Sequence, residues 1–566
     1  MAETLQCHIH VDVQNWELEK IRGNVCVNEL PLNKYTDGNY YCLFHLPTKD
    51  KDIFKFNEIL QSRLNLIRNQ IDETEDLDEK ENTLELTKAR LALGDEHVFK
   101  FGNGADDSYQ QRKPTYDFSY VFFPSLANFI DYEFKARVNF SSTTFSEAAH
   151  FSLGKFTKYA DFGSAKFLEG ANFSSTIFKD DASFISTKFL SGCNFSNSIF
   201  SNKAYFRHAS FAQGILFSSA EFCDVTIFEE ANFSGYTSFD LAQFNELVSF
   251  RRANFLSDAQ FNLTNFSSDL DFVGTVFAQN VQFISSKFLE TSKVSFNKTK
   301  FQNTVNFRSA IFAGYITFEG DLGENMLFGE IGKTKAVLDL QNVRLEKPER
   351  ISFYRVQLLP NWFVNIDSRK IIFIDVVWEN LSNNFANENL FAELKNLEKR
   401  GMEKPKQLFR IACRQLAENA ENNNRYEEAS NFRRMAMETE WFERKEKLKA
   451  KPENFLDFFR QVRDISIYGL YRFSSSYGER WGRAFIWFVL ICPVFALLFY
   501  LFGTFEKAVL QTFGDYLAYS LQVMTLQRPE PKPLGFWTNI IYTMELVLAP
   551  VQLALLALAI RRKFMR

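Results

Sequence analysis

The sequence predicts a narrow β-solenoid, followed by a helical region and two membrane-spanning helices. The first observation is that Phe recurs from Phe129 to Phe288 at separations that alternate between five and six residues. The second is that, after about residue 387, apolar residues recur at three- and four-residue spacing among many charges, which is typical of helices. The third is a pair of long, almost uncharged segments near the end of the chain.

The Phe spacing fits neither a helix nor a flat strand. Five residues rotate a helix by about 500°, so alternate Phe residues would leave a common face. On a strand, an odd separation places successive side chains on opposite faces. The position two before each Phe is small or apolar, as at Ala171, Thr176 and Ala182. A chain that turns a corner every five or six residues fits this pattern, with a small residue and a ring inside each turn.

Segments such as ANFSSTIF (171–178) and AYFRHASF (204–211) resemble the pentapeptide-repeat family in a Phe-centred variant. The resemblance implies a right-handed quadrilateral β-helix. Four sides of five or six residues make a coil of about 22, so the run from Phe129 to Phe318 would form about nine coils. A two-residue stutter interrupts the run after Phe288. We assign 113–380 to the solenoid and its C-terminal cap.

The rest of the chain divides into three further regions. Residues 1–112 read as an N-terminal mixed α/β module, 381–476 as a helical linker domain and 477–566 as a two-span membrane domain with a re-entrant-like loop. Within the linker, two helices on either side of NNN (422–424) look like a hairpin of tetratricopeptide type. A basic, aromatic, amphipathic segment then leads to the membrane. It either lies along the membrane surface or packs against the hairpin.

The two apolar segments run from Ala484 to Phe502 and from Phe536 to Ile560, and each is long enough to cross a bilayer. Basic residues flank them on the sides that lead into and out of the hairpin: Arg480, Arg483, Arg561, Arg562, Lys563 and Arg566. The positive-inside rule therefore predicts a multi-pass protein of the cell (inner) membrane with both termini in the cytoplasm. The N-terminal residues show no basic region followed by an apolar core, which agrees with that topology. The alternative is two buried core helices of a soluble domain.

Between the spans, Thr512–Gln527 is too short to cross a bilayer and has the length of a re-entrant helix. This plan resembles the two-helix pore domain of tetrameric cation channels, and YSLQVMTL (519–526) resembles the end of a pore helix. The resemblance implies a homo-oligomer, with a tetramer favoured. RPEPKP (528–533) stands where a glycine-rich filter would be, so a potassium filter is not supported. A plain hairpin anchor with an external loop is the alternative.

Four polar residues are candidates for a pore: Glu545, Gln552, Ser520 and Thr525. An acid within a span is costly, so by default it faces a cavity or a partner. We therefore expect Glu545 to face a lumen or a neighbouring subunit. The alternative is that it lies close enough to the outer interface to reach water.

A structural zinc site is the one cofactor that the sequence offers. Cys42 and His45 form a Cys-x2-His pair, and Cys7 and Cys26 could complete a tetrahedral set. The alternative is that these Cys residues are buried in a small β core without metal.

No catalytic motif is present, so we expect no enzymatic activity. The solenoid is close to neutral, which argues against the acidic surface that nucleic-acid mimicry needs. The sequence therefore predicts an oligomeric, channel-like pore in a lipid bilayer, with a cytosolic solenoid as sensor or gate. The alternative is a non-conducting, membrane-anchored scaffold whose solenoid binds a protein partner.

Overall fold

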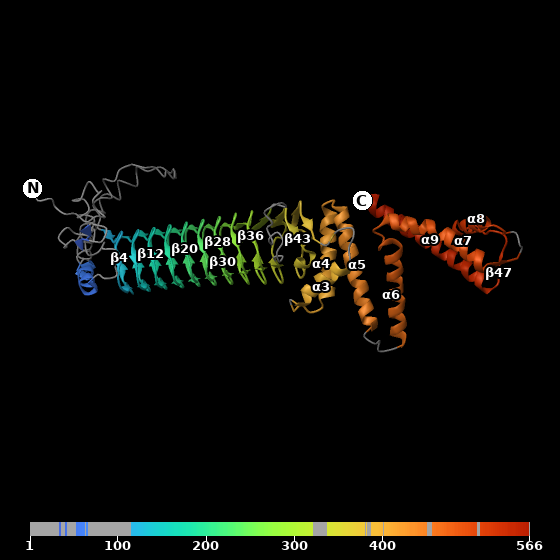
Figure 1. Ribbon diagram of the computed structural model, residues 1–566. Coiled ribbons are helices and arrows are strands. Elements are labelled where there is room, and N and C mark those ends of the chain that lie inside the picture. The colour runs from blue at the N-terminus through green and yellow to red at the C-terminus, as the bar shows by residue number, and fades with distance from the viewer. Residues whose placement is uncertain are drawn as a thin grey trace, which may run out of the picture. The chain divides into compact units, whose positions relative to one another are not determined.

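A computed structural model describes residues 33–34, 40–41, 52–62, 64–65, 115–320, 337–379, 381, 387–399, 401–449, 455–506 and 510–564 (Figure 1). The chain forms two compact units. One comprises Met1–Leu358 and Ile371–Val377, and the other comprises Leu359–Lys370 and Trp378–Arg566. Each unit is described by itself.

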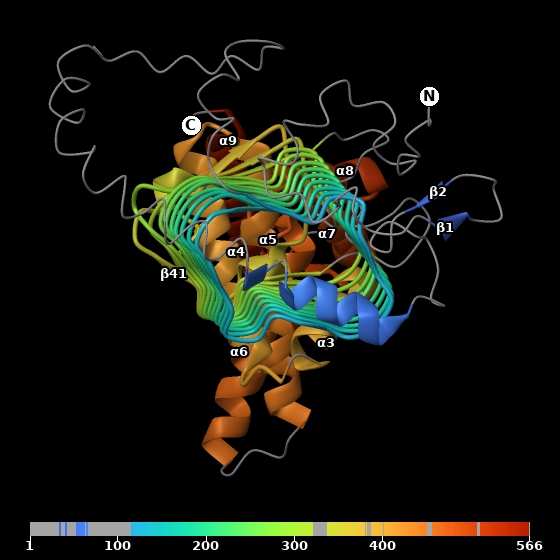
Figure 2. The same cartoon turned by 90° about the vertical axis from the view of Figure 1, so that its left-hand side faces the viewer.

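The first unit contains the predicted β-solenoid, which is confirmed. Four parallel sheets form its walls, and Figure 2 shows the coils superimposed as a four-sided outline. The first wall has twelve strands: β3 (Thr115–Asp117), β7 (Arg137–Asn139), β11 (Ala160–Asp161), β15 (Ala182–Ser183), β19 (Ala204–Tyr205), β23 (Thr226–Ile227), β27 (Val248–Ser249), β31 (Leu270–Asp271), β35 (Lys293–Ser295), β39 (Tyr315–Glu319), β42 (Ile351–Tyr354) and β44 (Ile372–Ile374). The second wall has nine: β4 (Phe122–Phe123), β8 (Thr144–Phe145), β12 (Lys166–Phe167), β16 (Lys188–Phe189), β20 (Ser210–Phe211), β24 (Asn232–Phe233), β28 (Asn254–Phe255), β32 (Val276–Phe277) and β36 (Lys300–Phe301).

The other two walls have ten strands each. The third wall consists of β5 (Ala127–Asn128), β9 (Ala149–His150), β13 (Ala171–Asn172), β17 (Cys193–Asn194), β21 (Ile215–Leu216), β25 (Thr237–Ser238), β29 (Ala259–Gln260), β33 (Val281–Gln282), β37 (Val305–Asn306) and β40 (Leu338–Asp339). The fourth wall consists of β6 (Glu133–Phe134), β10 (Lys155–Phe156), β14 (Ile177–Phe178), β18 (Ile199–Phe200), β22 (Glu221–Phe222), β26 (Gln243–Phe244), β30 (Asn265–Phe266), β34 (Lys287–Phe288), β38 (Ile311–Phe312) and β41 (Arg344–Leu345). The coils therefore begin before Phe129 and continue beyond Phe318, so the solenoid is longer than the nine predicted coils.

Each Phe lies above its counterpart one coil away. Phe156 pairs in register with Phe178, a separation of 22 residues, as the repeat length predicts. Phe206 is fully buried, and its ring stacks on Phe184 (4.9 Å, 3°) and Phe228 (4.7 Å, 10°). Phe195 and Phe217 meet the same ring edge-on. Both geometries are favourable for aromatic pairs, so the rings stack along the axis and lock across it.

The alternation of five and six residues has a structural cause at the corners. Each five-residue step contains a tight turn, as where the Ala165 N–H donates to the Phe162 carbonyl (3.0 Å) and Ser164 has φ +57°. A positive φ recurs at every eleventh position from Tyr120 to Ser285, twice per coil. None of these residues is Val, Ile or Thr, the residues that tolerate positive φ least. The six-residue steps do not need this conformation.

Buried hydroxyl groups satisfy the carbonyls at these corners. Thr187 Oγ1 donates to the Phe162 carbonyl one coil away (2.7 Å), and Thr275 Oγ1 does the same to Phe250 (2.6 Å). This explains why the small position before a Phe is so often Thr or Ser, since a buried carbonyl keeps a partner there.

The stutter after Phe288 is accommodated without loss of pairing. Leu270 pairs with Val294, so this coil holds 24 residues instead of 22. Further on, Val305 pairs with Leu338, and Phe353 stacks on Phe373. The strands thus continue to pair after the Phe rhythm fades, as the predicted irregular terminal coils require.

At the other end of the solenoid, residues 53–62 and 64–65 are helical, and Figure 2 shows this helix across the first coil. The Phe56 ring packs edge-on against Phe123 (5.6 Å), and Leu60 and Leu64 are also buried. The helix therefore covers the first Phe layer, which a solenoid must shield from water. Two short strands, β1 (Asn33–Lys34) and β2 (Tyr40–Tyr41), pair antiparallel in this region.

The second unit is mainly helical. Its first helices are α3 (Asn387–Lys399), α4 (Pro405–Asn422) and α5 (Tyr426–Lys449), and α4 and α5 form the predicted hairpin around NNN. The Asn419 amide donates to the carbonyls of Ser368 (2.9 Å) and Arg369 (3.0 Å) and so ties the segment after η4 (Pro360–Phe363) to α4. The remaining elements are α6 (Phe455–Ser475), α7 (Trp481–Phe502), β46 (Thr504–Phe505), α8 (Phe513–Met524), β47 (Pro533–Leu534) and α9 (Phe536–Phe564). Three short elements complete the two units: η3 (Pro348–Arg350), β43 (Gln357–Leu358) and β45 (Val377–Trp378).

The Phe stack makes the solenoid sensitive to a single cavity. We predict that Phe206→Ala costs about 3–5 kcal/mol, because a large void forms between stacked rings. Leu216→Ala is the matched control, since this apolar side chain lies on the outside and its loss costs within about 0.5 kcal/mol. Urea denaturation followed by the circular dichroism of the strands measures both, and equal effects would contradict the assigned inward position of Phe206.

The corners make a second prediction. Ser186 has φ +58°, so Ser186→Val should cost about 1–2 kcal/mol, whereas Ser186→Gly should be tolerated. Ser201 lies at a corner without positive φ, and Ser201→Val serves as the control. The same denaturation experiment compares the three variants, and a Val penalty of the same size at both corners would refute the conformational explanation.

Candidate functional site

The long apolar helices α7 and α9 are the first element of the candidate site. Trp481–Phe502 and Phe536–Arg561 are long and apolar enough to cross a membrane, yet only 17% and 28% of their most apolar windows are buried. A core helix of a soluble domain would bury most of such a surface. The exposed large side chains of α7 include Phe485, Ile486, Val489, Leu490, Val494, Leu497, Tyr500 and Leu501.

The short helix α8 packs between these two helices. It begins with a capping box in which Thr512 and Asp515 exchange hydrogen bonds. Its first turns lie beside the end of α7, where Tyr516 meets Tyr500 edge-on (5.6 Å). Later residues reach further back along α7, where Tyr519 meets Phe499 and Ser520 Oγ lies 3.0 Å from the Cys492 carbonyl.

Ser520 lies near the middle of the hairpin. It contacts Cys492, ten residues before the end of α7, and Glu545, nine residues after the start of α9. At 1.5 Å per residue these positions lie about 15 and about 14 Å from the connected ends of the two helices. The connected ends are joined by pairing of β46 with β47. Since a bilayer core is about 30 Å thick, α8 has the geometry of a re-entrant helix that reaches half-way.

Glu545 and Ser520 form a buried polar pair, and both side chains are fully buried. Ser520 Oγ contacts two groups, a Glu545 carboxyl oxygen and the Cys492 carbonyl oxygen. A serine hydroxyl carries one proton and cannot donate to both. If Glu545 is protonated, it donates to Ser520, and Ser520 donates to Cys492, so every contact has a proton. The other carboxyl oxygen has no hydrogen-bond partner, which is far less costly for a neutral acid than for a buried anion.

The structure places the four predicted pore residues in different surroundings. Ser520 and Glu545 meet inside one chain, with the acid turned into the hairpin and away from its surface. Gln552 is also buried and donates to the Ala484 carbonyl of α7 (2.8 Å). Thr525 is exposed and bonds only to carbonyls of α8, among them that of Leu521 (2.9 Å). Whether any of the four lines a pore stays a prediction.

After α8 the chain returns to β47 through a polar segment, which we call the return segment (Thr525–Lys532). Its side chains Thr525, Gln527, Arg528, Glu530 and Lys532 are exposed, as is Gln522 in the last turn of α8. The segment has no helical or strand hydrogen bonding between the end of α8 and the start of β47. It therefore leaves polar groups uncovered on an otherwise apolar hairpin.

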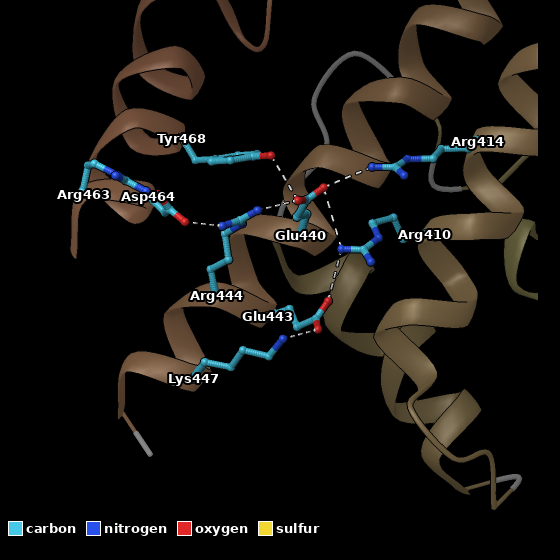
Figure 3. Close-up of polar contacts among 9 residues, drawn as sticks. All are labelled: Arg410, Arg414, Glu440, Glu443, Arg444, Lys447, Arg463, Asp464 and Tyr468. Atoms are coloured by element: carbon cyan, nitrogen blue, oxygen red, sulfur yellow. Dashed lines mark hydrogen bonds and ion pairs between the residues drawn. The ribbon is translucent and has the colours of Figure 1, made fainter. Parts of the chain in front are cut away.

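A polar network joins α4, α5 and α6 (Figure 3). Its centre is Glu440, which accepts hydrogen bonds from Arg444 (2.9 Å), Arg414 (3.1 Å) and Tyr468 (3.0 Å). Although burial opposes ionisation, these hydrogen bonds and the nearby Arg410 hold the pKa of the Glu440 carboxyl below its ordinary value. The network borders a hollow of about 320 Å³ whose acids and bases are paired with one another. It fixes the polar face of α6 against α5.

The turn between α6 and α7 is also tightly held. Ser476, Tyr477 and Gly478 have consecutive φ values of +53°, +65° and +73°. Tyr477 is buried, and burial raises its pKa well above the ordinary value. Next to the turn, Glu479 accepts hydrogen bonds from Ser430 (2.6 Å) and Arg433 (3.0 Å) of α5. The start of α7 is thereby anchored to the helical hairpin.

The predicted zinc ligands, Cys7, Cys26, Cys42 and His45, lie outside the described residues. Within the part of the chain that the structure describes, no group of three or more His, Cys, Asp and Glu side chains could hold a metal ion. The zinc site stays a prediction. The Glu440 network and the turn at 476–478 were missed by sequence reasoning. A signal for the first was the spacing of Glu440, Glu443, Arg444 and Lys447 by three and four residues on one helix.

Comparison with known proteins identifies the repeat. Residues 195–243 match the family model described as pentapeptide repeats (9 copies). No curated protein and no solved structure matches the chain. The Phe-rich solenoid is therefore built of pentapeptide repeats, while the helical and apolar regions have no matched relative.

The hydrogen-bond pattern at Glu545 makes a prediction that separates a neutral from a charged acid. Glu545→Gln keeps an N–H that can donate to Ser520, so the thermal stability of the protein in detergent should stay close to that of the wild type. Glu545→Ala removes the donor and opens a cavity, at about 1–3 kcal/mol for the lost donor alone. Infrared spectroscopy should show a protonated carboxyl band that disappears in Glu545→Gln. Absence of that band in the wild type would show that the acid is charged.

Proposed function

We propose that the protein is a membrane-embedded oligomer of channel-like plan, with the pentapeptide-repeat solenoid on its cytoplasmic side. The observation that carries this proposal is the return segment. Irregular backbone and polar side chains do not face lipid at the depth of the hydrocarbon core, but they occur where they are covered by protein or line a water-filled cavity. In one chain the side chains of Gln522, Thr525, Gln527 and Arg528 are exposed. Assembly of several hairpins around these segments would remove them from lipid.

The proposed lining differs from the one that the sequence predicts. Glu545 is engaged with Ser520 inside the hairpin, so it offers no carboxylate to a lumen in this conformation. The exposed groups of the return segment are amides, a hydroxyl and charged side chains. We propose that they, rather than Glu545, border the central space. No enzymatic activity is part of this proposal.

The proposed topology follows from the basic residues at the free ends of the hairpin. Arg480 and Arg483 precede α7, and Arg561 and Arg562 lie at the end of α9. The positive-inside rule places these ends in the cytoplasm, together with the solenoid and α3 to α6. The connected ends, with β46 and β47, then face the opposite side.

A membrane-anchored scaffold is the second candidate. Two observations favour it: Glu545 is satisfied within one chain, and the solenoid offers long, regular walls for a protein partner. In this reading α7 and α9 only anchor the protein, and the return segment lies at the membrane surface.

The two candidates are separated by purifying the full chain in nanodiscs and recording from planar bilayers. We expect symmetric oligomers and a current whose ion preference changes in Arg528→Gln. Glu545→Gln is the matched control and should leave the current unchanged, because its side chain is inside the hairpin. Oligomers without current would favour the scaffold, and monomers without current would overturn the proposed assembly.

A further inference from the structure

The helix α6 presents its faces in the reverse of the usual order. Its polar and aromatic side chains turn toward α5: Asp464 bonds to Arg444 (3.0 Å), Tyr468 to Glu440 (3.0 Å) and Arg472 to Glu438 (2.9 Å). A helix on the surface of a soluble domain buries its apolar stripe and exposes its polar face. Here the packing against the protein uses the polar face.

The opposite face of α6 is apolar and exposed. Phe459, Ile467, Leu470 and Phe473 are 54%, 56%, 65% and 59% exposed. Ile467, Leu470 and Phe473 follow one another at a spacing of three residues and lie on one side of the helix. Arg460 and Arg463 are exposed nearer the start of α6. An exposed apolar stripe with basic neighbours is the composition of helices that lie in a membrane interface.

This stripe is continuous with the exposed apolar surface of α7. The ring of Phe473 packs on Trp487 in the second turn of α7, with centroids 4.5 Å apart. In Figure 1 the axis of α6 crosses the direction of α7 and α9 instead of continuing it. The turn at 476–478 and the bonds of Glu479 to α5 fix this arrangement. If α7 crosses a bilayer, the apolar side of α6 therefore adjoins the same lipid surface.

We propose that α6 is an interfacial helix, whose face of Phe459, Ile467, Leu470 and Phe473 inserts into the cytoplasmic leaflet at the boundary between headgroups and acyl chains. Arg460 and Arg463 would contact anionic headgroups there. The proposal rests on the membrane anchoring in the proposed function but not on a pore or on oligomers. The occupant is lipid and not a second protein, because the stripe continues into the lipid-facing surface of a span.

The test places an environment-sensitive fluorophore on the full-length protein in nanodiscs of zwitterionic and anionic phospholipid. Leu470→Cys carries the probe on the stripe. Ile411→Cys is the matched control, since Ile411 is also apolar and exposed but lies on α4. Wild-type protein treated with the same reagent gives the background from its native Cys residues. Spin-labelled lipids and aqueous iodide serve as quenchers.

We expect the probe at residue 470 to be quenched by spin-labelled lipid and protected from iodide, and the probe at residue 411 to show the reverse. Quenching of residue 470 by iodide, as at residue 411, would overturn the proposal. Protection of residue 470 from both quenchers would also overturn it, because protein would then cover the stripe. Current recordings test the channel separately, so failure of one proposal leaves the other open to its own result.

Discussion

Stacking of Phe rings at a fixed separation of 22 residues is the constraint on which the solenoid depends. The rings fill a shaft that has no other large side chains over most of its length, and each ring touches neighbours along and across the axis. The small residue two positions earlier leaves room for the ring, and its hydroxyl group, where present, serves the carbonyl at the corner. Ring packing, corner conformation and strand register therefore specify one another.

The solenoid was predictable because its determinants are local and repeated. Phe, small residue and turn recur at short intervals, and each coil repeats the evidence of the one before. The start of the solenoid was less accessible, since the packing of Phe56 on Phe123 joins segments that share no repeat. The number of coils was underestimated for the same reason, because pairing continues where Phe is replaced, as at Ile351 and Ile372.

The candidate site shows where sequence reasoning ends. The cost of an acid in an apolar helix indicated that Glu545 needs a partner, but the spacing could not identify it. Ser520 lies 25 residues away and reaches Glu545 only because α8 folds back between α7 and α9. The direction of α6 shows the same limit: its amphipathic pattern was visible, and both alternatives contained part of the answer. Its polar face packs on the hairpin, while its apolar face remains exposed, since Glu440, Arg444 and Asp464 attract that polar face.

The 22-residue register also governs how the solenoid can change in length. Removal or addition of a whole coil restores every ring to its stack and alters the length by one strand spacing, about 4.8 Å. A change by any other number of residues must be absorbed in a bulge, as the 24-residue coil between Leu270 and Val294 absorbs two. Related solenoids of this type should therefore differ in length by discrete steps. The distance between the two ends of the solenoid behaves as a ruler that evolution can reset one graduation at a time.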